Sequence, residues 1–216
     1  DYMITIITVT LNNIKGLKKT INSIRRQTYS DWEVVVKDGS SIDGTIDFCK
    51  ELQSTEDRLR FFSSKDNGIY DAMNIAIKKA SGEFIIFMNA GDVFENTKVL
   101  KEFNSFALLN IADIYFGHTI MSMFDKKFFR PAKSAKYLDY GQPALHQSTF
   151  YRTNIHKENL FLLEYEISSD YATTLSMYCK GASTIIFPFT VSEFEIDTQS
   201  TSFKNQKQSR TEMMKA

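Results

Sequence analysis

Three clusters of small polar and acidic residues in the first half of the chain could bind a ligand. They occupy residues 8–13, 38–44 and 89–92. Their hydroxyl, amide and carboxylate groups could hold a nucleobase, a ribose or a cation beside a phosphate group. The same residue types are common in turns, so each cluster taken alone could equally be turn chemistry. A fold that brings the clusters together would favour the ligand-binding interpretation.

The elements between these clusters alternate between strand and helix patterns. Predicted strands cover residues 3–10, 32–36, 59–62 and 83–88, and predicted helices cover residues 17–24, 46–52, 70–80 and 97–109. This order indicates an α/β fold with a mostly parallel sheet and helices on both of its faces. Ligands bind beyond the carboxyl ends of the strands in such sheets, and all three clusters follow a strand. We therefore expect the clusters to share one edge of the sheet.

The second half of the chain is less regular. A predicted strand covers residues 113–123, and residues 127–129 could pair with it through a polar turn at residues 125–126. The remaining predicted elements are a loop at 132–142, a strand at 148–151, a helix at 171–180 and a strand at 183–187.

We expect a single domain over residues 3–200, followed by a basic, polar C-terminal tail over residues 201–216. The tail carries a local charge of about +3. It could continue past residue 216 and contact anionic lipid, or it could be a solvated, disordered end.

Composition excludes several classes of protein. The 26 Lys and Arg residues balance 26 Asp and Glu residues, which argues against general nucleic-acid binding. No apolar run approaches the roughly 20 residues of a membrane-spanning helix. Two cysteines do not make a disulfide framework, so a reducing, cytoplasmic setting is the default expectation.

Several sharper motifs are absent. Residues 39–44 have the glycine spacing of a P-loop but lack its lysine, and residues 38–49 lack the ligands of an EF-hand. No G-x-G-x-x-G follows a predicted strand, and no G-x-S-x-G is present. A nicotinamide-dependent dehydrogenase and an α/β-hydrolase are therefore not expected.

Several segments closely resemble family 2 glycosyltransferases of the GT-A fold. They are I-I-T-V-T-L-N-N at 6–13, V-K-D-G-S-S-I-D-G-T at 36–45, D-N-G-I-Y-D-A-M-N at 66–74, L-H-Q-S-T-F at 145–150 and S-D-Y at 169–171. The segment at 66–74 resembles a signature sequence of one branch of this family, the bacterial enzymes that assemble exopolysaccharide, capsule and O-antigen. The resemblance covers roughly residues 4–189 and implies a Rossmann-like GT-A domain.

The resemblance implies a nucleotide site. Its predicted members are Thr8, Thr10, Asn12, Asp38 and Asn89. An ionised Asp38 could accept a hydrogen bond from uracil N3–H, although it could also be a turn residue.

The remaining predicted contacts to the donor and acceptor come from two other segments. Asp71 and Asn74 are three residues apart on a predicted helix face and would contact the donor sugar or the ribose. His146 would contact phosphate or acceptor, or bind a metal, although a lone histidine is as often structural.

The expected metal motif departs from the family pattern. The family usually has an Asp-x-Asp-type cluster, but this chain has Asn89-Ala90-Gly91-Asp92, so only Asp92 supplies a carboxylate. Mn²⁺ or Mg²⁺ could take its other ligands from diphosphate and water. The alternative is that Asp92 only caps a turn.

The resemblance assigns the catalytic base to Asp170, at the start of the predicted helix 171–180. A helix N-terminus favours an ionised carboxylate, which can accept a proton. The alternative role for Asp170 is an N-cap.

Together these features predict an inverting glycosyltransferase that moves a sugar from a UDP-sugar to a glycan or lipid-linked acceptor in cell-surface polysaccharide synthesis. It would act in the cytoplasm, with peripheral contact at the inner membrane face. One alternative is a catalytically lapsed nucleotide- or glycan-binding member of the same fold. A sugar nucleotidyltransferase is a weaker alternative, since residues 8–15 lack a glycine-rich, basic phosphate loop.

Overall fold

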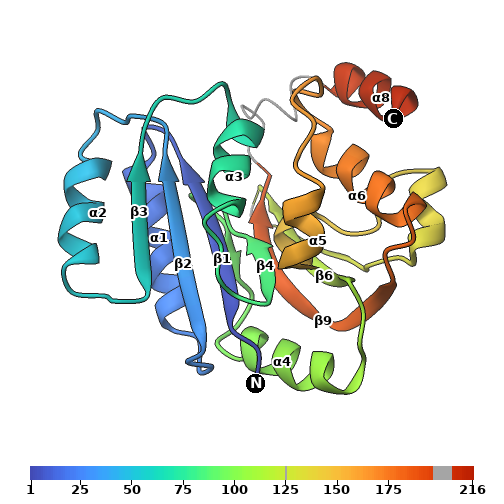
Figure 1. Cartoon of the computed structure of the whole chain (residues 1–216), viewed down its shortest axis with the longest axis horizontal. Coiled ribbons are helices and arrows are strands. Elements are labelled where there is room, and N and C mark those ends of the chain that lie inside the picture. The colour runs from blue at the N-terminus through green and yellow to red at the C-terminus, as the bar shows by residue number, and fades with distance from the viewer. Residues whose placement is uncertain (125, 197–205) are drawn as a thin grey trace.

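The apolar, β-branched runs of the chain form one mixed sheet. The computed structural model describes residues 1–124, 126–196 and 206–216. In these residues nine strands pair in the order β3-β2-β1-β4-β8-β6-β9-β5, with β7 beside β6 (Figure 1). The strands are β1 (Ile4–Thr10), β2 (Trp32–Asp38), β3 (Leu59–Ser63), β4 (Phe84–Phe87), β5 (Val93–Phe94), β6 (Ile114–Met123), β7 (Lys126–Arg130), β8 (Thr149–Arg152) and β9 (Thr184–Glu195).

The first four strands of the chain confirm the predicted parallel arrangement. β1 pairs in parallel with both β2 and β4, and β2 pairs in parallel with β3. The register places Thr10 opposite Asp38, and Asp38 opposite Ser63. The carboxyl ends of these strands therefore meet at one edge, as the sequence predicted.

The second half of the sheet is mixed, so the expectation of a mostly parallel sheet holds for the first half only. β8 lies antiparallel between β4 and β6, whereas β6 and β9 are parallel. β7 pairs with β6 as a hairpin, as the sequence predicted, and residue 125 of its turn lies outside the described residues.

The last strand is longer than predicted because β9 continues past Pro188. The pairing with β6 shifts register between Phe116 and His118, whose partners are Ile186 and Thr190. Pro188 lies within this irregularity. Because the regular pairing with β6 is interrupted there, the lack of an N–H group in proline does not remove a ladder hydrogen bond.

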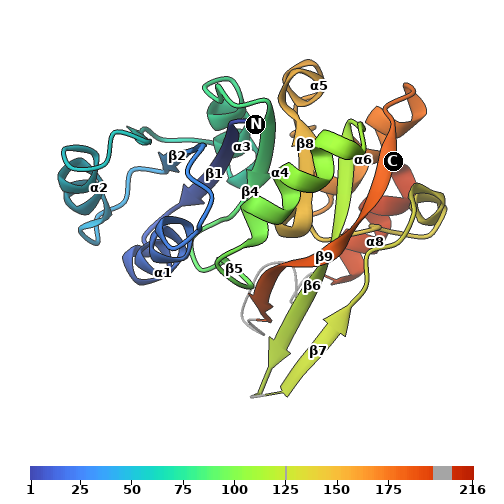
Figure 2. The same ribbon diagram turned by 90° about the horizontal axis from the view of Figure 1, so that it is seen from below.

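Helices cover both faces of the sheet, which confirms that part of the prediction. α1 (Ile14–Arg25), α2 (Thr45–Gln53) and α4 (Val99–Leu109) pack on one face. α3 (Ile69–Ile77), α5 (Thr153–Glu158) and α6 (Ser169–Cys179) pack on the other (Figure 2). In α1, for example, Leu17, Ile21 and Ile24 recur at helical spacing and are all buried. Two short 3₁₀ helices, Ala135–Asp139 and His146–Ser148, complete the second half.

The predicted C-terminal tail is partly helical. Residues Gln206–Lys215 form α8, and Glu212 on this helix is only 8% exposed. Lys204, which contributed to the predicted basic charge, lies outside the described residues. Among the helices that the structure describes, none is long and apolar enough to cross a membrane.

Candidate functional site

A cavity of about 310 Å³ opens where β1 and β4 end. Its lining comes from the end of β1, the loops after β1 and β4, the segment that leads into α3 and the first turn of α3. The lining residues are Val9, Thr10, Leu11, Asn13, Asp66, Gly68, Ile69, Ala72, Asn89 and Ala90. The structure therefore brings the first and third polar clusters together around one space.

The second cluster begins at the end of β2, next to the end of β1, and none of its residues lines this cavity. Asp38 has no exposed surface, and its carboxylate accepts hydrogen bonds from the N–H groups of Ser40 and Ser41 and from the hydroxyls of Ser41 and Ser63. Three of these hydrogen bonds reach one carboxylate oxygen, and the hydroxyl of Ser41 reaches the other. In this structure Asp38 shapes the loop after β2, and its predicted contact with uracil stays a prediction.

Thr8, Thr10 and Asn12 lie differently from one another. Thr10 lines the cavity, and its buried hydroxyl has no hydrogen-bond partner among the described residues. Thr8 is also buried without a partner, but it does not line the cavity. Asn12 joins two loops, because its side-chain oxygen accepts from the N–H of Ile42 and its own N–H donates to Ser41. Of these three, Thr10 is the one placed to contact a ligand in the cavity.

Asp71 and Asn74 make internal contacts instead of lining the cavity. Asp71 accepts hydrogen bonds from the backbone and side-chain N–H groups of Asn67, which closes the first turn of α3. The buried amide of Asn74 donates to the carbonyl of Phe161 and accepts from its N–H. The side-chain amide of Asn74 is thus already paired in this structure, whereas these contacts use only one carboxylate oxygen of Asp71. The predicted contact of both residues with the donor sugar or the ribose stays a prediction.

Sequence reasoning missed Lys37 and Asp66. Lys37 is completely buried, and its ammonium lies 2.7 Å from Asp66 and donates to the carbonyls of Asp38 and Ser64. Asp66 in turn lines the cavity and accepts from the N–H of Gly68. A lysine inside the run V-V-V-K-D was the available signal, since a lysine in a buried strand requires a buried partner.

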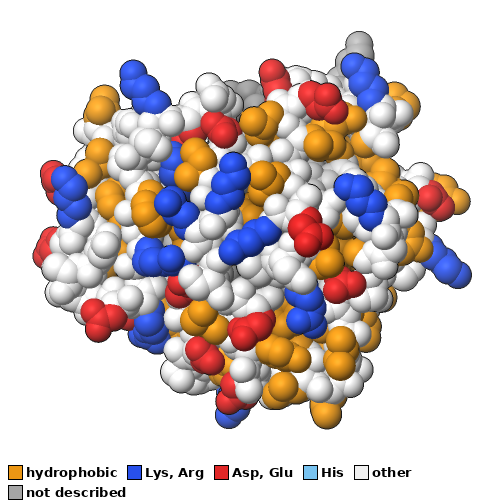
Figure 3. Space-filling model, in the orientation of Figure 1, with side chains coloured by type: hydrophobic (Ala, Val, Ile, Leu, Met, Phe, Trp, Pro, Cys, Tyr) orange, Lys and Arg blue, Asp and Glu red, His pale blue; other side chains and the backbone are white. Residues whose placement is uncertain are grey.

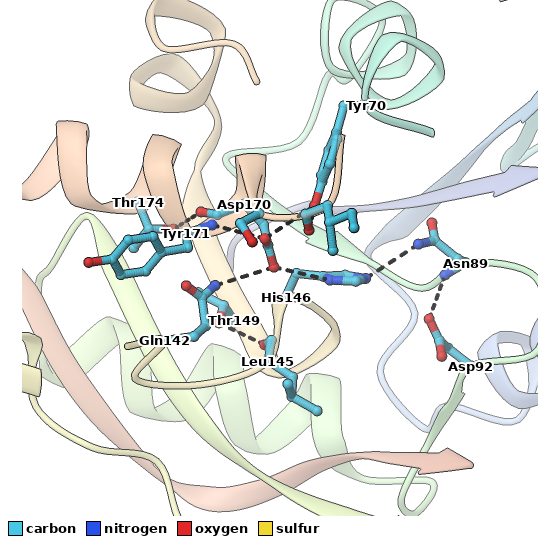
Figure 4. Close-up of polar contacts among 12 residues, drawn as sticks. Tyr70, Asn89, Asp92, Gln142, Leu145, His146, Thr149, Asp170, Tyr171 and Thr174 are labelled. Carbon is cyan, nitrogen blue, oxygen red and sulfur yellow. Dashed lines mark hydrogen bonds and ion pairs between the residues drawn. The ribbon is translucent and has the colours of Figure 1, made fainter. Parts of the chain in front are cut away.

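Four of the predicted site residues lie in one polar series (Figure 4). The side-chain amide of Asn89 is 3.3 Å from Nε2 of His146, and Nδ1 of His146 is 3.6 Å from Asp170. The N–H of Asn89 donates to Asp92 at 3.0 Å. Gly91 permits this turn because its φ of +114° is unfavourable for other residues.

Asp170 lies in the first turn of α6 and is held from several sides. One carboxylate oxygen accepts from the hydroxyl of Tyr70 at 3.2 Å and from the N–H of Tyr171 at 2.9 Å. The other oxygen faces Gln142 at 3.4 Å and His146. The side chain of Asp170 is 19% exposed, so its carboxylate remains accessible.

The pKa values of Asp92 and His146, two residues that contact Asn89, are both raised, but for different reasons. Burial raises the pKa of Asp92, against opposing effects of His146, the N–H of Asn89 and Lys19. Burial alone would lower the pKa of His146, but its hydrogen bond to Asp170 and the negative charges of Asp170 and Asp92 outweigh burial and raise it. His146 is therefore protonated over a wider pH range than a free histidine.

The described residues contain no group of three or more His, Cys, Asp or Glu side chains that could hold a metal ion by themselves. Asp92 offers one carboxylate, and the side-chain oxygen of Asn89 is buried without a hydrogen-bond partner. Both are oxygen donors, which Mg²⁺ and Mn²⁺ prefer. A divalent cation held by these two residues would need to take its other ligands from a bound diphosphate and water.

Fold and site together define a GT-A domain. The profile of the family described as "Glycosyl transferase family 2" matches residues 5–184, so the chain belongs to this family. This finding confirms the resemblance inferred from the motifs.

Curated relatives are bacterial glycosyltransferases. A PGL/p-HBAD biosynthesis glycosyltransferase of Mycobacterium bovis is 30% identical over 183 residues, covering 83% of this chain and 71% of the relative. The Escherichia coli UDP-Glc:alpha-D-GlcNAc-diphosphoundecaprenol beta-1,3-glucosyltransferase WfgD is 30% identical over 123 residues, covering 56% of this chain and 48% of WfgD. The chain thus spans about half the length of WfgD.

Solved structures share the fold. Residues 1–349 of S. aureus TarS, in complex with UDP-GlcNAc, superpose with a TM-score of 0.78 at 19% identity, covering 94% of this chain and 60% of TarS. A mannosyltransferase from Pyrobaculum calidifontis, in complex with GDP-Man and Mn²⁺, gives a TM-score of 0.72 at 16% identity, covering 99% of this chain and 62% of that protein. The predicted fold is confirmed.

Proposed function

We propose that this chain transfers a sugar from a nucleotide-sugar donor, a UDP-sugar, to a glycan or lipid-linked acceptor, with inversion at the anomeric carbon. The observation that carries the proposal is the series Asp92–Asn89–His146–Asp170 beside the cavity at the ends of β1 and β4. It puts a candidate base at one end and a candidate cation ligand at the other. Names of relatives that use or bind UDP-sugars support the choice of donor.

The cavity suits the nucleotide part of the donor. Thr10 and Asn89 each present a buried oxygen without a partner among the described residues, and Asp66 adds a carboxylate. Leu11 and Ile69 supply apolar surface, and both are exposed in the free protein. A base or a ribose in this space would satisfy the unpaired oxygens and cover the apolar side chains.

In the proposed mechanism Asp170 acts as the base. Its carboxylate takes the proton of an acceptor hydroxyl while that oxygen attacks the anomeric carbon from the side opposite the leaving diphosphate. Single displacement of this kind inverts the anomeric centre. Tyr70 and the N–H of Tyr171 hold one oxygen of Asp170, which orients the other toward His146 and Gln142. In its protonated form, His146 would add positive charge near the leaving group.

The cation in this proposal would be Mn²⁺ or Mg²⁺, held by Asp92 and the side-chain oxygen of Asn89. It would neutralise charge that builds up on the leaving diphosphate. Because the protein would supply only one carboxylate ligand, we expect tight cation binding only in the presence of a nucleotide.

The name of WfgD supports a lipid-linked acceptor in cell-surface glycan synthesis. We place the reaction in the cytoplasm, at the inner face of the membrane if the acceptor is lipid-linked. The predicted lipid contact of the basic tail has less support, since Glu212 of this segment is buried against the protein.

The test is a thermal-shift panel of UDP, GDP, CDP, ADP and NAD, each with Mn²⁺ or with EDTA. Binding at about 100 times Kd should stabilise the protein by about 2.7 kcal/mol. For a domain of this size that corresponds to a shift of several degrees, at about 2–4 °C per kcal/mol. We expect a Mn²⁺-dependent shift with UDP, followed by UDP release from a UDP-sugar.

The outcomes separate the alternatives. A shift with UDP but no turnover of any UDP-sugar, even with candidate acceptors, would favour a lapsed binding protein. A larger shift with GDP than with UDP would move the donor to GDP-sugars. No shift with any nucleotide would contradict the proposed function.

A further inference from the structure

Three consecutive backbone N–H groups in front of α6 converge on one carboxylate from α8. The N–H groups of Ile167 and Ser168 donate to one oxygen of Glu212 at 3.0 and 2.9 Å, and that of Glu166 donates to the other at 3.2 Å. Glu212 is 8% exposed, in a helix that is otherwise strongly polar. A buried carboxylate that accepts from three N–H groups holds the segment that donates them, residues 166–168, in a defined conformation.

Other hydrogen bonds strengthen the junction between α8 and residues 166–168. The amide of Gln208 donates to Glu212 at 3.1 Å, one helical turn away. The hydroxyl of Ser168 lies 2.8 Å from that of Ser209. Burial would raise the pKa of Glu212, but the hydrogen bonds from Ile167, Ser168 and Gln208 outweigh burial and lower it. The carboxylate is therefore ionised at neutral pH, which strengthens its hydrogen bonds.

The segment held by Glu212 leads directly to Asp170. Both backbone polar groups of Ile167 are hydrogen-bonded: its N–H donates to Glu212, and its carbonyl accepts from the hydroxyl of Tyr70 at 2.6 Å. The same Tyr70 hydroxyl also contacts Asp170 at 3.2 Å. Releasing residues 166–168 would thus loosen Tyr70 and the start of α6 together, and with them the carboxylate of Asp170.

We propose that Glu212 is a positioning residue for Asp170, so that α8 helps to assemble the site where the acceptor is deprotonated. The inference rests on the proposed function, in which Asp170 is the base. Glu212 lies outside residues 5–184, the region that the family profile matches. The family resemblance would not have revealed this residue.

The test compares Glu212→Ala and Glu212→Gln with a control on the same helix, Met214→Ala. Met214 is 81% exposed and takes no part in the junction. The measured quantity is the rate of UDP release from UDP-glucose or UDP-GlcNAc, divided by the number of UDP-binding sites found by calorimetry in the same sample. This ratio removes any loss that comes from unfolded protein.

We expect Glu212→Ala to lower turnover per site by about 10- to 100-fold, as a misplaced catalytic group does. The Kd for UDP should change by less than about twofold, since the cavity is lined by other residues. Glu212→Gln keeps one acceptor oxygen and should lose less turnover, which makes it the variant to use if Glu212→Ala does not fold. Met214→Ala should behave as the wild type.

A double variant separates positioning from general stabilisation. If Glu212 acts through Asp170, adding Glu212→Ala to Asp170→Asn should cause little further loss of residual turnover. Hydrogen exchange should also show faster exchange of the amides of residues 166–168 in Glu212→Ala but not in Met214→Ala.

The results distinguish this inference from the proposed function. If the wild type is active and Glu212→Ala keeps its turnover per site, or if the losses in the double variant add fully, Glu212 is not a positioning residue. If the wild type neither binds UDP nor releases it from a UDP-sugar, the proposed function fails and the role of Glu212 in catalysis fails with it.

Discussion

At the scale of single residues, the contact between Asp170 and His146 is the feature on which the proposed mechanism depends. The two residues come from different elements, α6 and the 3₁₀ helix His146–Ser148, and lie 3.6 Å apart. The motifs H-Q-S-T and S-D-Y predicted both residues, but their mutual contact could not be predicted because 23 residues separate them.

Replacing Asp170 tests its proposed role as the base. We expect Asp170→Asn to lower the rate of sugar transfer or donor hydrolysis by about 10²- to 10⁴-fold, because the amide cannot accept the proton. Calorimetry should find UDP affinity nearly unchanged, since Asp170 does not line the cavity. Asp47→Asn, an exposed change on α2, is the matched control. Equal activities of Asp170→Asn and the control would remove Asp170 from the mechanism.

His156 predicts a pH dependence of stability. It is fully buried among Phe87, Tyr151 and Phe161, and burial lowers its pKa to about 4. An unfolded histidine binds a proton below about pH 6.5, whereas the folded one stays neutral, so the folded state loses stability as pH falls from 6.5 to 4. The loss reaches about 3 kcal/mol.

Urea unfolding at several pH values measures this loss. His156→Phe keeps an aromatic ring in the cluster and cannot be protonated. Its free energy of unfolding should therefore fall less steeply between pH 6.5 and 4 than that of the wild type. Identical slopes would show that other groups cause the acid sensitivity.

At the scale of elements, the ends of β1, β2 and β4 position the cavity. Their order could be predicted because each strand is a short apolar run followed by polar turn residues. The antiparallel insertion of β8 between β4 and β6 could not, because sequence periodicity carries no information on strand neighbours. The short helix α5 was missed for a related reason, since its six residues show little periodicity.

The same limit applies within the site. Asp38, Asp71 and Asn74 have the residue types of ligand contacts, and the structure shows internal hydrogen bonds to them that the sequence did not predict. The partner of Asn74, the backbone of Phe161, is distant in sequence, and no sequence motif indicates the contact. Thr10 and Asn89 line the cavity, and this position could be predicted because they lie at the ends of predicted strands. His146, which lies in a recognisable motif, contacts Asn89.

The pair Lys37–Asp66 ties the end of β2 to the segment before α3. Lys37→Met should destabilise the protein by about 3–5 kcal/mol, because it leaves the Asp66 carboxylate partly buried without its partner. The double variant Lys37→Met/Asp66→Asn should recover part of this loss in thermal unfolding. A double variant that is less stable than Lys37→Met would contradict the pairing argument.

At the scale of the whole molecule, charge is balanced and dispersed. The 26 basic and 26 acidic residues cancel, and Figure 3 shows both signs mixed over the face that it displays. A protein without net charge has little electrostatic repulsion between copies. The hairpin β6–β7, which projects from the body in Figure 2, adds exposed aromatic surface through Phe124, Phe128 and Phe129.

This combination predicts limited solubility near neutral pH. Phe124→Ser/Phe128→Ser should raise the protein concentration at which precipitation begins at pH 7, because it removes two exposed aromatic side chains from one hairpin. Ile42→Ser is the matched control, since Ile42 is 92% exposed and lies in the loop before α2. Light scattering measures both, and an equal gain from the control would show that the hairpin has no special effect.

The contact between Glu212 and the segment before α6 also bears on how the protein is made. Chains emerge from the ribosome N-terminus first, so every residue of the cleft is synthesised before Glu212. Residues 166–168 leave the ribosome before α8 and have no carboxylate partner until α8 follows. If Glu212 positions Asp170 as proposed, the nascent chain has all residues of its cavity before it can complete the site around Asp170.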